Sequence, residues 1–192
     1  MGKLSVFNFM TLNGYFKGPN EDTSWHQHGN PEEGEFAAKG AQSDSIILFG
    51  RKTYEMMASF WPTDAALKSM PEIADGMNKS EKIVFSRTLK SADPIVIGWK
   101  NTRVVKNNIV EEVKKLKSAS KKDMTILGSG SILTQLAEAG LMDSFQFMLD
   151  PIALGDGTPI FKGIGNKLDL KLTATRAFKS GAVLLSYESV KK

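Results

Sequence analysis

The amino-acid sequence predicts an α/β fold whose sheet is mixed, mostly parallel, and closed at one side by an antiparallel C-terminal hairpin. Short apolar segments followed by helical segments recur three times, as in parallel strands joined by crossover helices. The last part of the chain alternates between polar and apolar residues on both sides of Lys179–Gly181, as in a hairpin. With 192 residues, 41% of them hydrophobic, we expect a single domain over residues 1–192.

The first half of the chain sets the order of the elements. Leu4–Leu12 is apolar with few breaks and stops at Asn13-Gly14, which predicts a strand that runs into a turn. A long loop rich in Pro, Gly, Asn and Asp follows from Gly18. Residues 32–42 have helical character, and the apolar segment 45–49 is typical of a central strand buried on both faces.

The second half continues this alternation. A helix is expected over residues 53–59, and the Pro- and Met-containing segment after it fits no single pattern. A lysine-rich amphipathic helix begins near Ile109, where apolar residues recur at helical spacing. Further strands are expected at residues 82–85, 95–97, 102–105, 125–127, 145–149, 168–178 and 182–187.

The net charge of +4 and the pI of about 9.2 raise the alternative of a nucleic-acid partner. Many of the lysines, however, fall in segments 111–117 and 121–122, where Ile109, Val113 and Leu116 form the apolar face of the helix. We therefore place these lysines on its solvent face. The segment has no aromatic residues between the basic ones, which makes nucleic-acid binding the weakest of the functions considered.

The chain contains no cysteine, which excludes disulfides, thiolate nucleophiles and cysteine-ligated zinc. This composition fits a reducing compartment. The N-terminal segment lacks a long apolar core with a small-residue cleavage site, and the sequence has no run of 18 apolar residues. We expect a cytoplasmic protein that binds neither membrane nor nucleic acid.

Three predicted strands end in small or basic residues: at 49–53 (Phe-Gly-Arg-Lys-Thr), at 85–88 (Phe-Ser-Arg-Thr) and at 127–131 (Leu-Gly-Ser-Gly-Ser). The carboxyl ends of parallel strands open into the ligand crevice, and a helix that begins there directs unpaired N–H groups at an anion. Glycine permits close approach of the backbone, and serine adds a donor. Together the three ends predict a phosphate-containing ligand, although each could also be an ordinary capped turn.

A dinucleotide fingerprint of the Rossmann kind is an alternative interpretation of the third end. Gly128 and Gly130 supply its first two glycines, and Asp150 follows at a distance suited to a ribose-binding acid. The position of the third glycine holds Leu133, and the chain beyond ends in a hairpin instead of a second half-sheet. We therefore reject this interpretation.

Other kinds of site have less support. His26 and His28 lie two apart in the long loop without an evident third ligand, so we interpret them as solvated loop residues and expect no metal. No Gly-x-Ser-x-Gly elbow is present for a serine nucleophile. The sequence also lacks the His-x-Glu and Pro-Cys-x-x-Cys pattern of the zinc deaminases.

The order of the motifs resembles the dihydrofolate-reductase-like superfamily, and most closely the reductase domain of the bifunctional riboflavin-biosynthesis deaminase-reductase with its stand-alone relatives. The resemblance spans nearly the whole chain. It rests on Thr11-Leu12-Asn13-Gly14, Gly18, Ser24-Trp25, the segments 46–53 and 126–131, Gly140-Leu141-Met142-Asp143 and Pro151-Ile152-Ala153-Leu154-Gly155. It implies an eight-stranded, mostly parallel sheet, a homodimer, and NADPH as the hydride donor to a small heterocyclic, pterin-like or ribosylamino-pyrimidine-like substrate.

The resemblance also implies a set of cofactor contacts. Ser86 and Arg87 would bind the adenosine ribose and its 2′-phosphate; this end carries no acid, which favours NADPH over NADH. The pyrophosphate and the nicotinamide would lie against two strand ends and the end of the first strand, at Met10, Thr11, Gly50, Arg51, Lys52, Thr53, Gly128, Ser129, Gly130, Ser131 and Ile132.

Catalytic residues are harder to assign. The resemblance would place Trp25 over the reacting ring. Members of the superfamily commonly have Asp where this chain has Asn13, and folate reductases carry a carboxylate on the helix after the long loop, for which Glu35 is a candidate beside Glu32 and Glu33. A true dihydrofolate reductase, and a nucleotide-binding protein without turnover, therefore remain alternatives to an NADPH-dependent reductase of another substrate.

Overall fold

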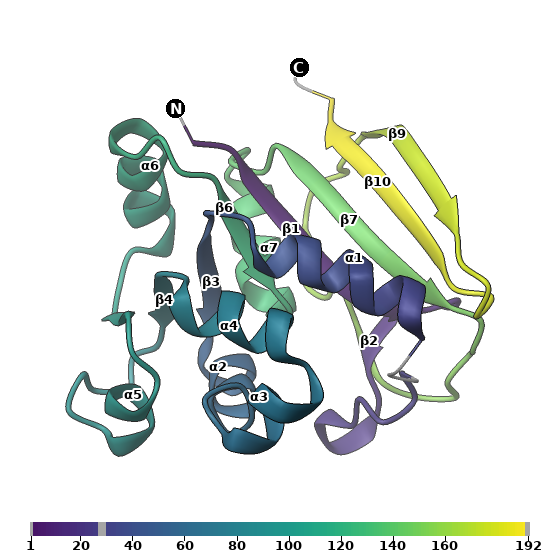
Figure 1. Ribbon diagram of the computed structural model, residues 1–192. Helices are drawn as coiled ribbons and strands as arrows, with labels where there is room; N and C mark the ends of the chain where they lie inside the picture. Colours follow the sequence, from purple (N-terminus) through teal and green to yellow (C-terminus); the bar gives the residue numbers. More distant parts are fainter. Residues whose placement is uncertain (1, 27–29, 191–192) are drawn as a thin grey trace.

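The computed structural model describes residues 2–26 and 30–190, which form an eight-stranded sheet with helices on both faces (Figure 1). Its strand order is β5-β4-β3-β6-β1-β7-β10-β9. The six strands from β5 to β7 are parallel to their neighbours, and β10 and β9 are antiparallel. The predicted mixed sheet with an antiparallel hairpin is thus confirmed. The strands are β1 (Leu4–Thr11), β3 (Ile46–Gly50), β4 (Lys82–Phe85), β5 (Thr102–Val105), β6 (Met124–Leu127), β7 (Ser144–Asp150), β9 (Leu170–Ala177) and β10 (Val183–Ser189).

A second, two-stranded sheet lies beside β1 and was not predicted from the sequence. It pairs β2 (Tyr15–Lys17) with β8 (Thr158–Pro159) in antiparallel orientation. Both strands are too short to show an alternating pattern. This small sheet brings the segment after β7 back to the end of β1.

Two layers of helices bury the apolar faces of the large sheet. The helices are α1 (Pro31–Ala41), α2 (Arg51–Ala58), α3 (Asp64–Ser69), α4 (Pro71–Lys79), α5 (Pro94–Gly98), α6 (Ile109–Ala119) and α7 (Gly130–Glu138), with a 3-10 turn η1 at Pro19–Glu21. In Figure 1, α1 and α4 lie in front of the sheet and α7 lies behind it. The core behind the sheet includes Leu4, Val6, Ile126, Leu133 and Leu136.

The front face is divided into two clusters. One packs Ile47 and Phe49 of β3 against Tyr54, Met77 and Trp99. The other joins Met148, Phe178, Ala182 and Leu184 to the partly buried Phe7, Phe9 and Phe36. Because side chains alternate along a strand, β1 directs Leu4 and Val6 to the back core and Phe7 and Phe9 to the front.

The structure corrects one predicted strand and assigns one uninterpreted segment. Residues 95–97 belong to α5 instead of a strand, because Pro94 follows Asp93 at the N-cap and supplies a preset first helical residue. The Pro- and Met-containing segment forms α3 and α4, which meet at Met70.

A second correction concerns the lysine-rich helix. Lys114 and Lys115 are exposed as expected, but Lys117 is only 7% exposed. Its ammonium group forms an ion pair with Asp143 and donates to the carbonyl of Leu141 at 2.8 Å. The aliphatic part of a lysine can be buried where its charge has such partners, so a pattern of polar letters does not place every lysine in solvent.

Candidate active site

The predicted strand ends meet at one edge of the sheet, the lower edge in Figure 1, which we call the carboxyl edge. It contains the last residues of β1, β3, β4, β6 and β7. The parallel pairing guarantees this, because all five strands run in the same direction.

Ser129 fastens the ends of β3 and β6 together. Its hydroxyl oxygen accepts a hydrogen bond from the backbone N–H of Gly50 at 2.7 Å and donates one to Thr53 Oγ1 at 3.1 Å. We call this arrangement the serine clasp. The hydroxyl is therefore not available to cap α7, for which Ser129 is the N-cap residue, and α2 likewise begins at Gly50 without a side-chain cap. Two helix starts thus meet with first-turn N–H groups that their own helices cannot satisfy.

The turn that carries the clasp requires its glycines. Gly128 and Ser129 are consecutive left-handed residues, with φ of 61° and 58°. A Cβ atom on Gly128 would lie 2.9 Å from Thr53 Cγ2, and one on Gly130 would lie 3.1 Å from the carbonyl oxygen of Ile160. Glycine is needed at both positions because the side chain of Thr53 in α2 and the carbonyl group of Ile160, just after β8, approach the turn so closely.

Other predicted contacts in this turn differ in their exposure. Ser131 is exposed, whereas Ile132 is 3% exposed and its side chain packs in the back core. The N–H of Ile132 bonds to the carbonyl of Ser129 at 2.9 Å. Gly130 and Ser131 are therefore better placed than Ile132 to offer backbone donors.

At this edge β1 extends beyond the end of β6. The register of the two strands ends at Phe7 opposite Leu127, the last residue of β6, whereas β1 continues to Thr11 and stays paired with β7 throughout. The β6-facing side of residues 8–11 of β1 therefore has no partner from β6 in the described register, and we call this side the opening between β1 and β6. Asn8 lies at the start of this opening; its side-chain Nδ2 is buried and has no hydrogen-bond partner among the described residues. An unpaired buried donor is costly, and a ligand acceptor at the opening would satisfy it.

Arg51 and Lys52 follow the end of β3, as predicted, but they already belong to the first turn of α2, and both are exposed. Lys52 Nζ is 2.9 Å from Glu21 Oε1 in η1, and Lys17 contacts the other oxygen of the same carboxylate. The hydrogen bond from Lys17, followed by that from Lys52, lowers the pKa of Glu21. Arg51 Nη1 is 3.3 Å from Glu55 one turn along its own helix. Glu21 thus holds two cations beside the two helix starts.

The end of β4 differs from the other two because no helix begins directly after it. The Ser86 hydroxyl is buried and accepts from the N–H groups of Thr88 and Leu89, at 3.2 and 3.0 Å. The predicted strand end is therefore a serine-stabilised turn. Arg87, at the apex of this turn, is exposed and forms no ion pair within the described part of the chain.

Asn13 acts as a connector at the end of β1. Its side chain accepts from Thr11 Oγ1 at 2.8 Å and from the backbone N–H of Leu154 at 3.2 Å, and it donates to the carbonyl of Leu154 at 2.7 Å. Thr11, which is fully buried, in turn accepts from the N–H of Tyr15 at 3.0 Å. These contacts hold the segment after β7 against β1. They give Asn13 a structural role that a sequence pattern does not reveal.

The structure contradicts the expectation that His26 is solvated. His26 is only 6% exposed, and its ring stacks on the ring of Phe9, with the centroids 3.7 Å apart and the planes at 30°. Nδ1 lies 3.1 and 3.0 Å from the two carboxylate oxygens of Asp150. Burial follows from this pairing, which joins residues from a loop and the end of β7. His28 lies outside the described residues.

Trp25 is half-buried and its ring meets His26 edge to face, with the centroids 6.2 Å apart. Its Nε1 donates to the carbonyl of Asp22 at 3.2 Å, so the indole is held by its own loop. Glu35 lies on α1 and is exposed. On the same helix, Glu32 accepts from the N–H of Lys179, and Glu33 accepts from the hydroxyl of Ser180.

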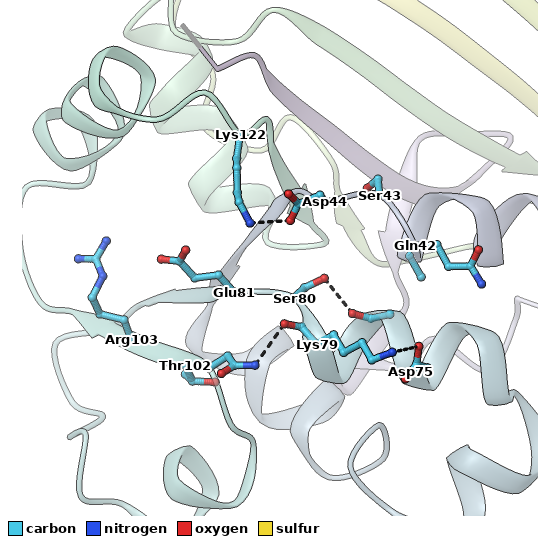
Figure 2. Close-up of a pocket in the computed structure, with 13 residues that line it drawn as sticks. Gln42, Ser43, Asp44, Asp75, Lys79, Ser80, Glu81, Thr102, Arg103 and Lys122 are labelled. Carbon is cyan, nitrogen blue, oxygen red and sulfur yellow. Dashed lines mark hydrogen bonds and ion pairs between the residues drawn. The ribbon is translucent and has the colours of Figure 1, made fainter.

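A cavity of about 750 Å³ lies at the opposite end of the strands, which we call the amino edge (Figure 2). Four charged residues of its lining form two ion pairs: Lys122 with Asp44 at 2.5 Å and Lys79 with Asp75 at 2.8 Å. Asn101 donates to the carbonyl of Lys79 at 3.1 Å. Size alone does not identify a site, and this cavity lacks the glycine turns and uncapped helix starts of the carboxyl edge.

Within residues 2–26 and 30–190, no group of three or more His, Asp or Glu side chains is arranged to hold a metal ion. The same residues contain no helix that is both long enough and apolar enough to span a membrane.

The sheet order and the antiparallel strands at its C-terminal side define a dihydrofolate-reductase-like fold. The chain shares it with dihydrofolate reductase from Enterococcus faecalis complexed with NADP(H), at a TM-score of 0.67 and 16% identity, over 99% of this chain and 98% of that one. The chain belongs to the RibD C-terminal domain family, whose model matches residues 3–184.

Two further relatives extend the comparison. The uncharacterized protein YyaP of Bacillus subtilis (strain 168) is 33% identical over 178 residues, which are 93% of this chain and 90% of that protein. A pyrimidine reductase-like protein from Corynebacterium diphtheriae has a TM-score of 0.71 at 12% identity, over 100% of this chain and 93% of that one.

Several features of the site had no usable signal in the sequence. His26 and Asp150 are 124 positions apart, and Asn13 and Leu154 are 141 apart. Asn8 offered a weak signal, because it is a polar residue that falls on the buried alternation of an apolar strand.

Proposed function

We propose that the protein is a reductase that uses NADPH to transfer a hydride to a small heterocyclic substrate of the pterin or ribosylamino-pyrimidine class. The observation that carries the proposal is the opening between β1 and β6, which is flanked by the serine clasp and the starts of α2 and α7. Membership of a family named for a riboflavin-biosynthesis domain, and the NADP(H) complex of a protein with the same fold, support it.

The residues of the carboxyl edge fit such a cofactor. The N–H groups at the starts of α2 and α7 would bind the pyrophosphate, with Arg51 and Lys52 beside them. The glycine turn packs closely against Thr53 and Ile160, which fixes the position of these N–H groups, and Asn8 Nδ2 is a buried donor that needs an acceptor. The bound cofactor would supply the hydride. The protein would position the substrate ring on the front side of β1, beside the partly buried Phe7 and Phe9, which would serve as an apolar wall, and Trp25 would cover the ring.

Cofactor selectivity provides the test. Arg87 is exposed and offers a forked guanidinium group that can bind a 2′-phosphate by charge-assisted hydrogen bonds, each worth about 1.5–3 kcal/mol. Arg87→Ala should therefore weaken NADPH binding about ten-fold or more and leave NADH binding nearly unchanged. Calorimetric titration of both cofactors into both proteins measures the difference.

Lys90→Ala is the matched control, because Lys90 is an exposed cation three positions further along the same segment. It should retain the preference of the wild-type protein for NADPH. If Arg87→Ala keeps that preference undiminished, Arg87 does not bind the 2′-phosphate. If the wild-type protein binds neither cofactor, the proposed function is wrong.

A further inference from the structure

We propose that His26, oriented by Asp150, donates the proton that completes reduction of a C=N bond in the substrate. The proposal rests on the proposed function and names a proton donor for it. The proposal rests on three groups that meet at the carboxyl edge: the buried imidazole of His26, the carboxylate of Asp150 at the end of β7, and Phe9 of the apolar wall.

The contact with Asp150 determines which nitrogen carries a hydrogen. Both carboxylate oxygens lie near Nδ1, at 3.1 and 3.0 Å, and an ionised carboxylate only accepts hydrogen bonds. Nδ1 is therefore the protonated nitrogen of the neutral ring. Nε2 is then the nitrogen that gains and loses a proton, and Asp150 stabilises the imidazolium while it exists.

The position of the pair matches the place where a proton is needed. Asp150 is the register partner of Thr11, the last residue of β1, so the carboxylate lies at the carboxyl edge on the β7 side of β1. The imidazole stacks on Phe9, which belongs to the apolar wall proposed for the substrate. Glu35, one of the three glutamates considered for this purpose on the family resemblance, is exposed on α1, whereas Glu32 and Glu33 bond to Lys179 and Ser180. The His26–Asp150 pair thus offers a buried proton donor where Glu35 is solvated.

The proposed reduction needs one hydride and one proton. The carbon of the C=N bond would receive the hydride, with its two electrons, from a bound reduced nicotinamide dinucleotide. The π electrons of that bond move to nitrogen, which takes the proton from Nε2 of the His26 imidazolium. The ring becomes neutral, keeps its Nδ1 hydrogen on Asp150, and regains a proton from water. The product is a secondary amine, and the cofactor leaves oxidised.

The kinetic test compares two acceptors. 7,8-Dihydrobiopterin contains a C=N bond that must be protonated, whereas menadione accepts a hydride to give an anion that water can protonate. For His26→Gln we expect kcat with dihydrobiopterin to fall about 100-fold, the scale of general acid catalysis, with KM and the NADPH dissociation constant changed by less than about three-fold. With menadione, kcat should change by less than about three-fold.

Two further variants test the orientation by Asp150, and a third serves as a control. Asp150→Asn keeps the shape of the side chain but removes its charge, and should lower kcat with dihydrobiopterin about ten-fold. Because the two side chains act as one unit, the double variant should be no slower than His26→Gln alone. His28→Gln, which changes the only other histidine of the chain, should match the wild-type protein.

A spectroscopic measurement tests the geometry without turnover. In ¹⁵N-histidine-labelled His28→Gln protein, His26 gives the only imidazole signals, and long-range ¹H–¹⁵N correlation should identify Nδ1 as the nitrogen that carries the hydrogen in the neutral form of the ring. Asp150→Ala in the same background should remove that preference. A ring protonated at Nε2 would refute the proposal.

The outcomes distinguish the proposed reductase function from the role of His26 as proton donor. Loss of NADPH binding in the wild-type protein contradicts the proposed function. The role of His26 is refuted if the wild-type protein binds NADPH but His26→Gln loses the same factor in kcat with both acceptors, or loses none with dihydrobiopterin. Either result leaves the proposed reductase function standing. A wild-type protein that binds NADPH but reduces neither acceptor, or only menadione, also contradicts this proton transfer.

Discussion

The two edges of the sheet differ in whether their polar groups have partners within the protein. At the amino edge, Lys117 is neutralised by Asp143, and the ammonium group of the fully buried Lys82 donates to the carbonyls of Met77, Asn78 and Ser80 at 2.9, 3.3 and 2.6 Å. At the carboxyl edge, the amide of Asn8 lacks a partner among the described residues, and two helices begin without side-chain caps. The amino edge is therefore arranged for stability, and the carboxyl edge leaves donors for a ligand.

The largest effect should come from filling the glycine turn. Gly128→Ala places a methyl group 2.9 Å from Thr53 Cγ2 at a residue with φ of 61°, so backbone strain and overpacking together should lower the free energy of unfolding by about 2–4 kcal/mol. The serine clasp should shift, and NADPH affinity should fall more than about ten-fold. Urea denaturation and calorimetric titration measure the two effects.

Gly140→Ala is the matched control, because Gly140 has φ of 66° but nothing lies within 4 Å of the added Cβ atom. It should carry only the backbone strain, about 1 kcal/mol, and leave NADPH binding unchanged. Equal destabilisation by the two variants would show that the close contact with Thr53 has no energetic weight.

A change at the amino edge should affect stability alone. Lys82→Met leaves three carbonyls near the end of α4 without their donor, which should cost about 1–3 kcal/mol of unfolding free energy. The dissociation constant of NADPH should stay the same, because the amino edge lies at the opposite end of the strands. A ten-fold loss of NADPH affinity in this variant would contradict the division between the edges.

Lys82 also predicts a pH dependence. Burial lowers its pKa from 10.5 to about 8. Between these values the unfolded chain binds more protons than the folded one, so the contribution of Lys82 to stability rises as the pH increases from 8 towards 10.5. Unfolding free energies of wild type and Lys82→Met at pH 7.5 and 9.5 should diverge in favour of the wild type. A constant difference between the two would contradict the lowered pKa.

Removing the clasp should have a smaller effect than filling the turn. Ser129→Ala leaves the N–H of Gly50 unpaired and should lower unfolding free energy by about 1–2 kcal/mol, with a several-fold loss of NADPH affinity. Ser189→Ala, which removes one bond from a hydroxyl to the carbonyl of Met142, serves as the control and should leave NADPH affinity unchanged. Equal affinities in the two variants would exclude the clasp from the binding site.

The smallest effect on the fold should come from the exposed edge strand. All but the first of the residues of β9 are exposed, and Leu172 is 50% exposed, so we propose that a second copy of the chain covers this strand in a homodimer. Leu172→Glu should give monomers in light scattering and change the unfolding free energy of the monomer by less than about 0.5 kcal/mol. Leu67→Glu, at a similarly exposed residue of α3, should remain dimeric. A monomeric wild type would refute the dimer.

The sequence predicted the parts of the fold that depend on local pattern. The apolar run of β3, the amphipathic α6 and the alternation around Gly181 each reflect one element and its own burial. The predicted strand at 95–97 was wrong because three apolar residues fit a helix turn as well as a strand, and Pro94 decided the outcome.

The sequence likewise predicted only those parts of the candidate site that depend on local pattern. The glycine and basic residues at the strand ends were found because parallel strands bring them to one edge. The partner of His26 could not be found, because no local rule connects a loop histidine to an aspartate at the end of β7. Asn13 was considered for catalysis on resemblance, and only the bonds to Leu154 reveal its connecting role.

The serine clasp also bears on how the chain folds. The Gly50–Ser129 bond joins residues 79 positions apart, the His26–Asp150 pair joins residues 124 apart, and the Asn13–Leu154 bonds join residues 141 apart. Contacts between residues so far apart in the sequence form after local structure, because closing the long intervening loop has an entropic cost. The pairs of the sheet itself, such as Leu4 with Met124, span similar separations, so a chain with only local structure would have neither the sheet nor its carboxyl edge. Cofactor binding would therefore report complete folding, and cofactor added during refolding would stabilise only the finished molecule.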